Sequence, residues 1–312
     1  MRFATLVPLI FSTSLIFAQE TPKLESEKPT QEQMEAAYKA HVQELTKDLH
    51  YQEGTAELPG GMAHLDLPKG FRYLDPADAK KVVVDLWGNP PQSANDILGL
   101  VVPAGEEIAS PESWAIVLSF EEDGYVSDKD ADKIDYNDLL SQLKENSKKA
   151  NEARKAQGYD TMDLTGWAVA PRYDHDSKVL YWAKRYAVPD ADEDTLNYDV
   201  RVLGRRGVLS LNGVAGIGRV NDIEAATPAI VSMVQFNDGH KYAQYNPSTD
   251  KEADYSLAGL VLGGAVAAKV AGKVGLLAKL GAILVAAKKF VVLGIVAVFA
   301  FIKKIFGRKS EA

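Results

Sequence analysis

The stretch between residues 167 and 214 decides the fold, because it contains four apolar, aromatic-rich runs separated by short turns. They read WAVAPRY at 167–173, VLYWAKRYAV at 179–188, NYDVRVL at 197–203 and GVLSLNGV at 207–214. Runs of this length, rich in Val, Leu, Tyr and Trp and bounded by Gly, Pro or Asp, are typical of β-strands. Short connections join antiparallel neighbours, so the pattern predicts four consecutive antiparallel strands.

The residues on either side of this core add further strands and three helices. A helix from Asp75 to Trp87 is predicted by an Asp-Pro start and a Gly stop, and a second one follows Asp135 and ends at Gly158. Asn221 or Asp222 is expected to cap a last helix that runs to about Asp238. Additional strands are expected at residues 51–58, 62–67, 71–74, 97–102 and 114–120. Strands in runs with inserted helices predict an α+β domain at residues 51–256, with a largely antiparallel sheet and packed helices.

The N-terminal 50 residues predict export followed by a helix. Residues 1–18 carry Arg2, an apolar stretch and Ala18 before a polar start, which is typical of a secretory signal peptide. An uncleaved anchor or a buried strand is the alternative. Residues 19–50 form a charged leader and then an amphipathic helix from about Gln31 to His50.

The C-terminus is apolar and basic and predicts a membrane anchor. Residues 257–289 are Gly/Ala-rich, residues 290–306 form the expected transmembrane anchor, and 307–312 are a basic tail. The apolar core of the anchor, residues 290–302, covers only about 20 Å as a helix, against about 30 Å of hydrocarbon. The lysine pairs that bracket it can extend its reach by snorkelling; they are Lys288, Lys289, Lys303 and Lys304.

Small residues recur every three or four positions in the Gly/Ala-rich segment, so a helix there would present them as one groove. Such grooves allow close helix packing in membranes. The stripe consists of Gly259, Gly263, Ala267, Ala271, Gly275, Ala278, Ala282 and Ala286. It predicts contact with membrane lipids and self-association or binding to a membrane protein. The alternatives are an accidental register and a helical hairpin in which residues 257–287 also cross the membrane.

Charge and composition exclude several classes of partner and chemistry. Residues 257–312 contain nine Lys/Arg and one acidic residue, whereas residues 19–256 contain 25 Lys/Arg and 42 Asp/Glu. The acidic body disfavours nucleic acid as a partner. The sequence has no cysteine, which excludes disulfides and thiolate chemistry. We expect no cofactor and no metal site.

Four residues are the candidates for a catalytic role. Asp174, His175 and Asp176 form a dyad-like neighbourhood, and Asp199 lies on a predicted strand nearby in sequence. No nucleophile signature accompanies them. Trp182 is followed by Lys184 and Arg185, and we expect these basic side chains to be exposed, where they would accept an anionic peptide or glycan.

Several short motifs resemble a known bacterial family. They are Leu67-Pro68-Lys69-Gly70-Phe71, Trp87-Gly88-Asn89-Pro90, Leu98-Gly99-Leu100-Val101, Gly166-Trp167 and Phe236-Asn237-Asp238-Gly239-His240-Lys241-Tyr242. Together with the Gly/Ala-rich tail they resemble domain of unknown function family 2167, which groups membrane-anchored proteins. The resemblance implies an extracytoplasmic domain with an anchor and assigns no activity.

These features together predict where the protein acts and what class of function it has. We expect a protein of the cytoplasmic (inner) membrane whose main domain faces the periplasm and acts in binding, sensing or envelope interaction. An enzyme is not favoured. The alternative is a hydrolase or transferase that acts on cell-envelope material through carboxylates. An inward-facing pair in a pocket would favour it, drawn from Asp174, His175, Asp176 and Asp199.

Overall fold

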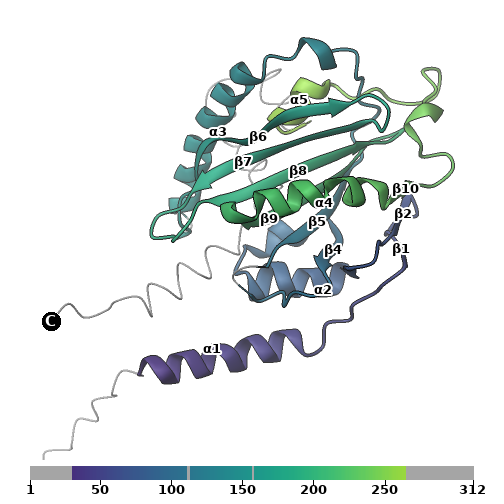
Figure 1. The fold of residues 1–312 in the computed structure, drawn as a ribbon. Helices are drawn as coiled ribbons and strands as arrows, with labels where there is room; N and C mark the ends of the chain where they lie inside the picture. The colour runs from purple at the N-terminus through teal and green to yellow at the C-terminus, as the bar shows by residue number, and fades with distance from the viewer. Residues whose placement is uncertain (1–29, 111–112, 157, 265–312) are drawn as a thin grey trace, which may run out of the picture.

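The computed structural model describes residues 30–110, 113–156 and 158–264, and it has an α+β architecture (Figure 1). A seven-stranded sheet has the order β3-β4-β5-β9-β8-β7-β6, with antiparallel pairing throughout. A smaller sheet has the order β1-β2-β10 and is also antiparallel. The large sheet is therefore the framework on which the helices are arranged.

The four strands expected between residues 167 and 214 are confirmed and form one half of the large sheet. They are β6 (Asp163–Asp174), β7 (Val179–Ala187), β8 (Thr195–Leu203) and β9 (Val208–Gly216). The other half consists of β3 (Phe71–Leu74), β4 (Ile97–Pro103) and β5 (Ala115–Glu121), and β5 joins the halves by pairing with β9.

The expected caps also form. The Asp75 carboxylate accepts bonds from the backbone N–H groups of Ala77 and Asp78 and starts α2 (Pro76–Lys80), which continues as a π-helical segment at Lys81–Leu86. Asp135 likewise caps α3 (Tyr136–Ala156). The N-terminal helix is α1 (Gln31–Thr46), and 3-10 turns occur at Pro91–Ala94, Ala131–Lys133, Ile217–Arg219 and Tyr242–Gln244.

One face of the large sheet packs against α4 (Val220–Ser232), which lies across the strands in Figure 1, and against the small sheet. Along β8 this apolar face carries Leu196, Tyr198, Val200 and Val202. These side chains share one cluster with residues of α4 and of β2 (Ala63–Asp66), so this face is a continuous apolar core.

The expectation for the last helix is wrong at both ends. Its N-cap is Arg219, and the helix ends at Ser232 instead of near Asp238. The residues that follow form β10 (Val234–Phe236), which pairs with β2; on its other side β2 pairs with β1 (Thr55–Glu57). The free edge of β2 decides this outcome, because its unpaired backbone groups bond the distant segment into a sheet.

The opposite face of the large sheet carries two apolar clusters. The first, around Leu100, Ala115 and Val214, is covered by α2 and the π-helical segment, with Leu45 of α1 packed at its margin. The second includes Leu180 and Trp182 and is covered by α3 and by α5 (Leu257–Leu262).

Helix α5 is part of this core, so the folded body extends beyond Ser256. Its Leu257, Leu260 and Val261 side chains are almost completely buried. The helix stops at Leu262 because Gly263 and Gly264 adopt positive φ values of 119° and 64°. The expectation of one continuous helix from residue 257 to 287 is therefore wrong at these two glycines.

The other small-residue positions, from Ala267 onward, and the bracketing lysines lie outside the described residues, as do the expected signal peptide, anchor and tail. A contact within the folded domain explains why position 259 is glycine, because a Cβ there would approach the Cβ of Tyr255 to 2.6 Å. Between residues 30 and 264, as far as the structure describes them, we find no helix with the length and hydropathy needed to cross a membrane.

Candidate functional site

The structure places three of the four candidate catalytic residues in the exposed β6–β7 turn. Asp174 Oδ1 accepts bonds from the backbone N–H groups of Asp176 (2.8 Å) and Ser177 (3.2 Å), and these bonds lower the pKa of its carboxyl. His175 is exposed, with Nε2 lying 3.2 Å from Asp132 Oδ1. The Asp174 carboxylate therefore stabilises a turn, as short Asp side chains commonly do.

Asp199, the fourth candidate, lies in the middle of β8 and is 1% exposed. Its carboxylate contacts Lys184 Nζ at 2.9 Å, Arg201 Nη2 at 2.8 Å and Asn212 Nδ2 at 3.0 Å. Burial by itself raises the pKa of this carboxyl, but Lys184 and Arg201 outweigh burial and hold the pKa below its usual range. Asp199 is thus an ionised member of a buried cluster, and it is not brought together with the β6–β7 turn.

The expectation that the basic side chains of residues 182–185 are exposed is wrong for Lys184 and correct for Arg185. Trp182 is 1% exposed and Lys184 is 7% exposed, and only Arg185 reaches solvent, where it pairs with Asp194. Lys184 is buried because it lies opposite Asn197 and beside Asp199 on the inner face of the sheet. Its ion pair compensates for the loss of water.

The described surface offers a different feature, a column of three stacked tyrosines. The Tyr125 ring centroid lies 4.6 Å from that of Tyr242 and 3.8 Å from that of Tyr245, with interplanar angles of 26° and 11°. Two rings this close to Tyr125 would collide on one side, so they occupy its opposite faces. We call Tyr242, Tyr125 and Tyr245, in that spatial order, the tyrosine column; all three are partly exposed.

The Tyr242 end of the column is anchored by hydrogen bonds and charge. The Tyr242 hydroxyl donates to the Val126 carbonyl at 3.0 Å, and Lys178 Nζ lies 5.4 Å from the Tyr242 ring centroid. Asp128 holds Lys178 at 2.9 Å and accepts from the Tyr173 hydroxyl at 2.8 Å. Burial raises the pKa of the Tyr242 hydroxyl, so that it stays protonated and keeps its bond.

The Tyr245 end is held by the loop that follows it. Asp250 receives Arg205 Nε at 2.7 Å and Nη2 at 3.0 Å and the Asn246 backbone N–H at 2.8 Å. These bonds, chiefly the one from Arg205, lower the pKa of Asp250 to about 2. These bonds tie the loop to Arg205 in the β8–β9 turn, and none of the ring or cation contacts among the described residues covers the outer face of Tyr245.

Sequence reasoning missed the tyrosine column, because its central ring comes from a position more than a hundred residues before the other two. The signal nearest to it was Tyr242 at the end of the Phe236–Tyr242 motif. Nothing in the local pattern around Tyr125 indicates a partner so distant in sequence.

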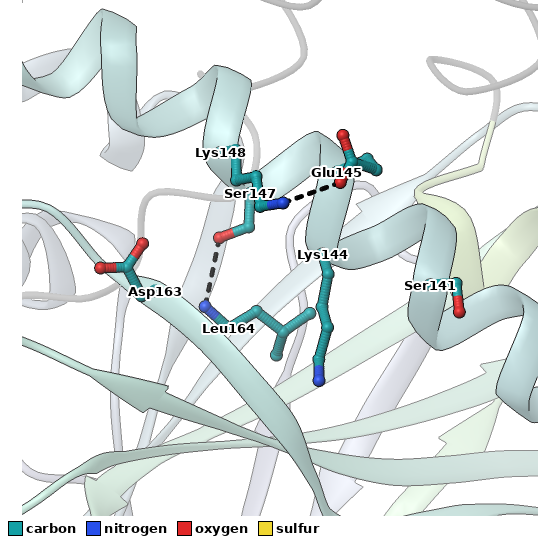
Figure 2. Close-up of a pocket in the computed structure, with 7 residues that line it drawn as sticks. All are labelled: Ser141, Lys144, Glu145, Ser147, Lys148, Asp163 and Leu164. Atoms are coloured by element: carbon teal, nitrogen blue, oxygen red, sulfur yellow. Dashed lines mark hydrogen bonds and ion pairs between the residues drawn. The ribbon is translucent and has the colours of Figure 1, made fainter.

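A shallow pocket of about 370 Å³ lies elsewhere, between α3 and the start of β6. Figure 2 shows Lys148 turned toward Glu145 and the Ser147 hydroxyl turned toward the Leu164 backbone N–H. None of the candidate catalytic residues lines it. The described part of the chain also contains no group of three or more His, Asp or Glu side chains arranged to hold a metal ion.

Comparison with known proteins adds a family and one distant structure. The family described as "Protein of unknown function (DUF2167)" matches residues 50–299. No curated protein matches the sequence. The solution structure of cyanobacterial PsbP (CyanoP) from Synechocystis sp. PCC 6803 is similar over 61% of this chain and 92% of that chain, at 14% identity and a TM-score of 0.33. A similarity this weak carries no argument.

Proposed function

We propose that this chain, which belongs to the DUF2167 family, is a binding module that acts outside the cytoplasm and is held on the cytoplasmic membrane by residues 290–306. The observation that carries the proposal is the tyrosine column. The export signal and the lysine-bracketed apolar segment expected from the sequence support the location.

The tyrosine column has the properties of a protein contact surface. Tyrosine combines a large apolar ring with a hydroxyl, and partly exposed aromatic side chains are enriched among residues that dominate binding energy. The two anchored ends keep the rings fixed, so binding costs little side-chain entropy. A partner surface that places a ring or an apolar side chain on the outer face of Tyr245 extends the stack.

The column also lies close to the point where the described chain ends. Tyr125 exchanges backbone hydrogen bonds with Lys251 and Ala253, at 2.9 and 2.8 Å, and the chain then passes through α5 to Gly264. Tyr255 donates to Asp123 Oδ2 at 3.0 Å, which ties this exit to the same loop. If the following residues lead to the anchor, the column faces a partner near the membrane, such as another membrane protein.

The carboxylate-based alternative gains no supporting geometry from the described residues. Asp199 is held ionised by two cations, so it is unsuited to donate a proton. Asp174 Oδ1 accepts two backbone N–H bonds that stabilise the exposed β6–β7 turn, away from Asp199.

A photo-crosslinking amino acid placed at position 245 of the full-length protein in living cells tests the contact surface. We expect a discrete crosslinked species that a matched probe at Gln142, an exposed position on α3, does not produce. Identical products from both positions, or none from position 245, would contradict the proposal.

The location is tested separately with reporter fusions. A reporter joined after Gly264 should be active only outside the cytoplasm, whereas one joined after Ala312 should be active inside, because basic residues that follow a single span stay in the cytoplasm. A C-terminal reporter active outside would establish the helical hairpin in place of a single span.

A further inference from the structure

The chain contains three dipeptides that are chemically prone to cyclise, two Asp–Gly pairs and one Asn–Gly pair. Glycine has no side chain to shield its backbone nitrogen, which can attack the side-chain carbonyl carbon of the residue before it. In an Asp–Gly pair the nitrogen loses its proton and the carboxyl group loses its hydroxyl, so a succinimide ring forms and water is released. Water then opens the ring at either carbonyl, which gives aspartate or isoaspartate. Isoaspartate lengthens the backbone by a methylene group.

Two of these pairs, Asp123–Gly124 and Asn212–Gly213, are held inside the fold. Gly124 is buried, and its N–H donates to the Arg206 carbonyl at 3.1 Å. Gly213 is buried in the middle of β9, which pairs with β5 on one side and β8 on the other. The fold therefore shields both glycine nitrogens from water.

The third pair, Asp238–Gly239, lies at the surface. Asp238 is exposed, and a Cβ added to Gly239 would have no neighbour within 4 Å, so packing does not restrain the pair. Glycine is nevertheless favoured there, because its φ is 85°. The restraint comes from the Gln244 side chain. Its Oε1 accepts from the Gly239 N–H at 2.7 Å, and its Nε2 donates to Asp238 Oδ1 at 2.6 Å. A single amide thus holds both groups that would react.

The backbone on either side of this pair is also fixed. Asn237 Nδ2 donates to the Gly61 carbonyl at 3.0 Å, and Arg205 Nη1 donates to the Gly239 carbonyl at 3.2 Å. Ring closure requires the Asp238 carboxyl group to turn toward the Gly239 nitrogen, and it requires that nitrogen to give up its proton. Because Gln244 is bonded to both groups, its two hydrogen bonds have to break before the ring can close.

We propose that Asp238–Gly239 is a latent isomerisation site and that Gln244 is the residue that keeps it from reacting. Gln244 ends the 3-10 turn Tyr242–Gln244, so it lies between two rings of the tyrosine column. The turn that presents these rings therefore also protects the loop that leads into it. Isomerisation inserts a methylene group into the backbone between β10 and Tyr242 and displaces this end of the column. The inference does not depend on what the column binds.

The test follows isoaspartate at position 238 in the full-length protein in detergent, incubated at neutral pH. Electron-transfer mass spectrometry of the peptide that contains position 238 distinguishes isoaspartate from aspartate. Gln244→Met keeps the length of the side chain and removes both hydrogen bonds, so we expect isoaspartate to form about tenfold faster. Gln235→Met is the matched control, because the Gln235 amide donates to the Ser232 carbonyl. It should match the native protein.

The Asp123–Gly124 pair in the same samples reports any general loss of structure. Its rate should be unchanged in Gln244→Met, since its glycine N–H is bonded to Arg206. Gln244→Glu retains an acceptor for the Gly239 N–H and loses the donor to Asp238, so its rate at position 238 should lie between those of the native protein and Gln244→Met. Equal rates at position 238 in the native protein and Gln244→Met would overturn the proposal. Parallel acceleration at positions 123 and 238, or a Gln244→Glu rate equal to that of Gln244→Met, would do the same.

Discussion

The two faces of the large sheet are both buried, yet they are built on different principles. Strand β8 shows the contrast within one segment, because Tyr198, Val200 and Val202 point toward α4, whereas Asp199 and Arg201 point to the opposite face. There they form, with Lys184 of β7, a buried cluster of charged side chains that we call the polar seam. All nine residues of β8 are buried. One face is stabilised by apolar area, and the other depends on ion pairs flanked by two apolar clusters.

This difference teaches that alternation along a strand does not by itself identify a solvent-facing side. Antiparallel sheets usually place the polar half of the pattern in water. Here α3, α5 and the π-helical segment cover the face that carries the polar residues. The ion pairs between these residues offset the cost of burying their charges. The two faces should therefore respond differently to truncation, to the loss of an ion pair and to acid.

Removing α5 should have the largest effect, because it uncovers part of the polar-seam face. A fragment ending at Ser256 lacks three almost fully buried aliphatic side chains, Leu257, Leu260 and Val261. Each is worth about 2–5 kcal/mol, so their loss approaches the whole stability of a typical domain. We expect residues 30–264 to unfold cooperatively in circular dichroism melts and residues 30–256 to show no such transition. Equal melting temperatures would mean that α5 is dispensable.

Breaking the ion pairs should cost less than losing α5 and more than trimming a surface charge. Asp199→Asn leaves Lys184 and Arg201 buried without their counter-charge, at a cost of about 3–5 kcal/mol. Replacing all three together by Met, Leu and Met should be nearly neutral, since no unpaired charge remains. Urea denaturation measures both. A triple variant as unstable as Asp199→Asn would show that the seam cannot be made apolar.

The polar-seam face should also be the more sensitive to acid. The folded-state pKa of Asp199 lies below its ordinary value of 3.8, because Lys184 and Arg201 outweigh burial. Its contribution is therefore fully present above that value and is lost as pH falls through the lowered folded pKa. Urea denaturation between pH 7 and pH 2 should show a shallower acid decline in the triple variant than in the native protein. Parallel curves would contradict the assignment.

The smallest effect is expected outside both faces, at the β6–β7 turn. His175 is exposed, and its Nε2 atom contacts the carboxylate of Asp132, which is also exposed. His175→Ala should change the free energy of unfolding by no more than about 0.5 kcal/mol. Thermal melts provide the measurement. The crosslinking pattern from position 245 should stay as in the native protein, and a loss of that pattern would reopen a functional role for the turn.

The sequence by itself determined most of the secondary structure. The four strands between residues 167 and 214 and the helices that follow Asp75 and Asp135 depend on signals within a few residues: apolar runs, turn residues and caps. These are local preferences of the backbone and of short side chains, so residues close in sequence are enough to predict them. The α+β class followed from the order of these elements.

Only the tertiary structure decided which polar residues are inside and which distant segments meet. Val234–Phe236 becomes β10 because β2 has a free edge, and α5 joins the core because Gly263 and Gly264 end it. Lys184 is buried because its ammonium group pairs with the Asp199 carboxylate on the neighbouring strand. The tyrosine column needs Tyr125 beside two rings more than a hundred residues away. Each outcome depends on a contact with a residue or strand that is distant in sequence. The local sequence does not indicate which distant residue that is.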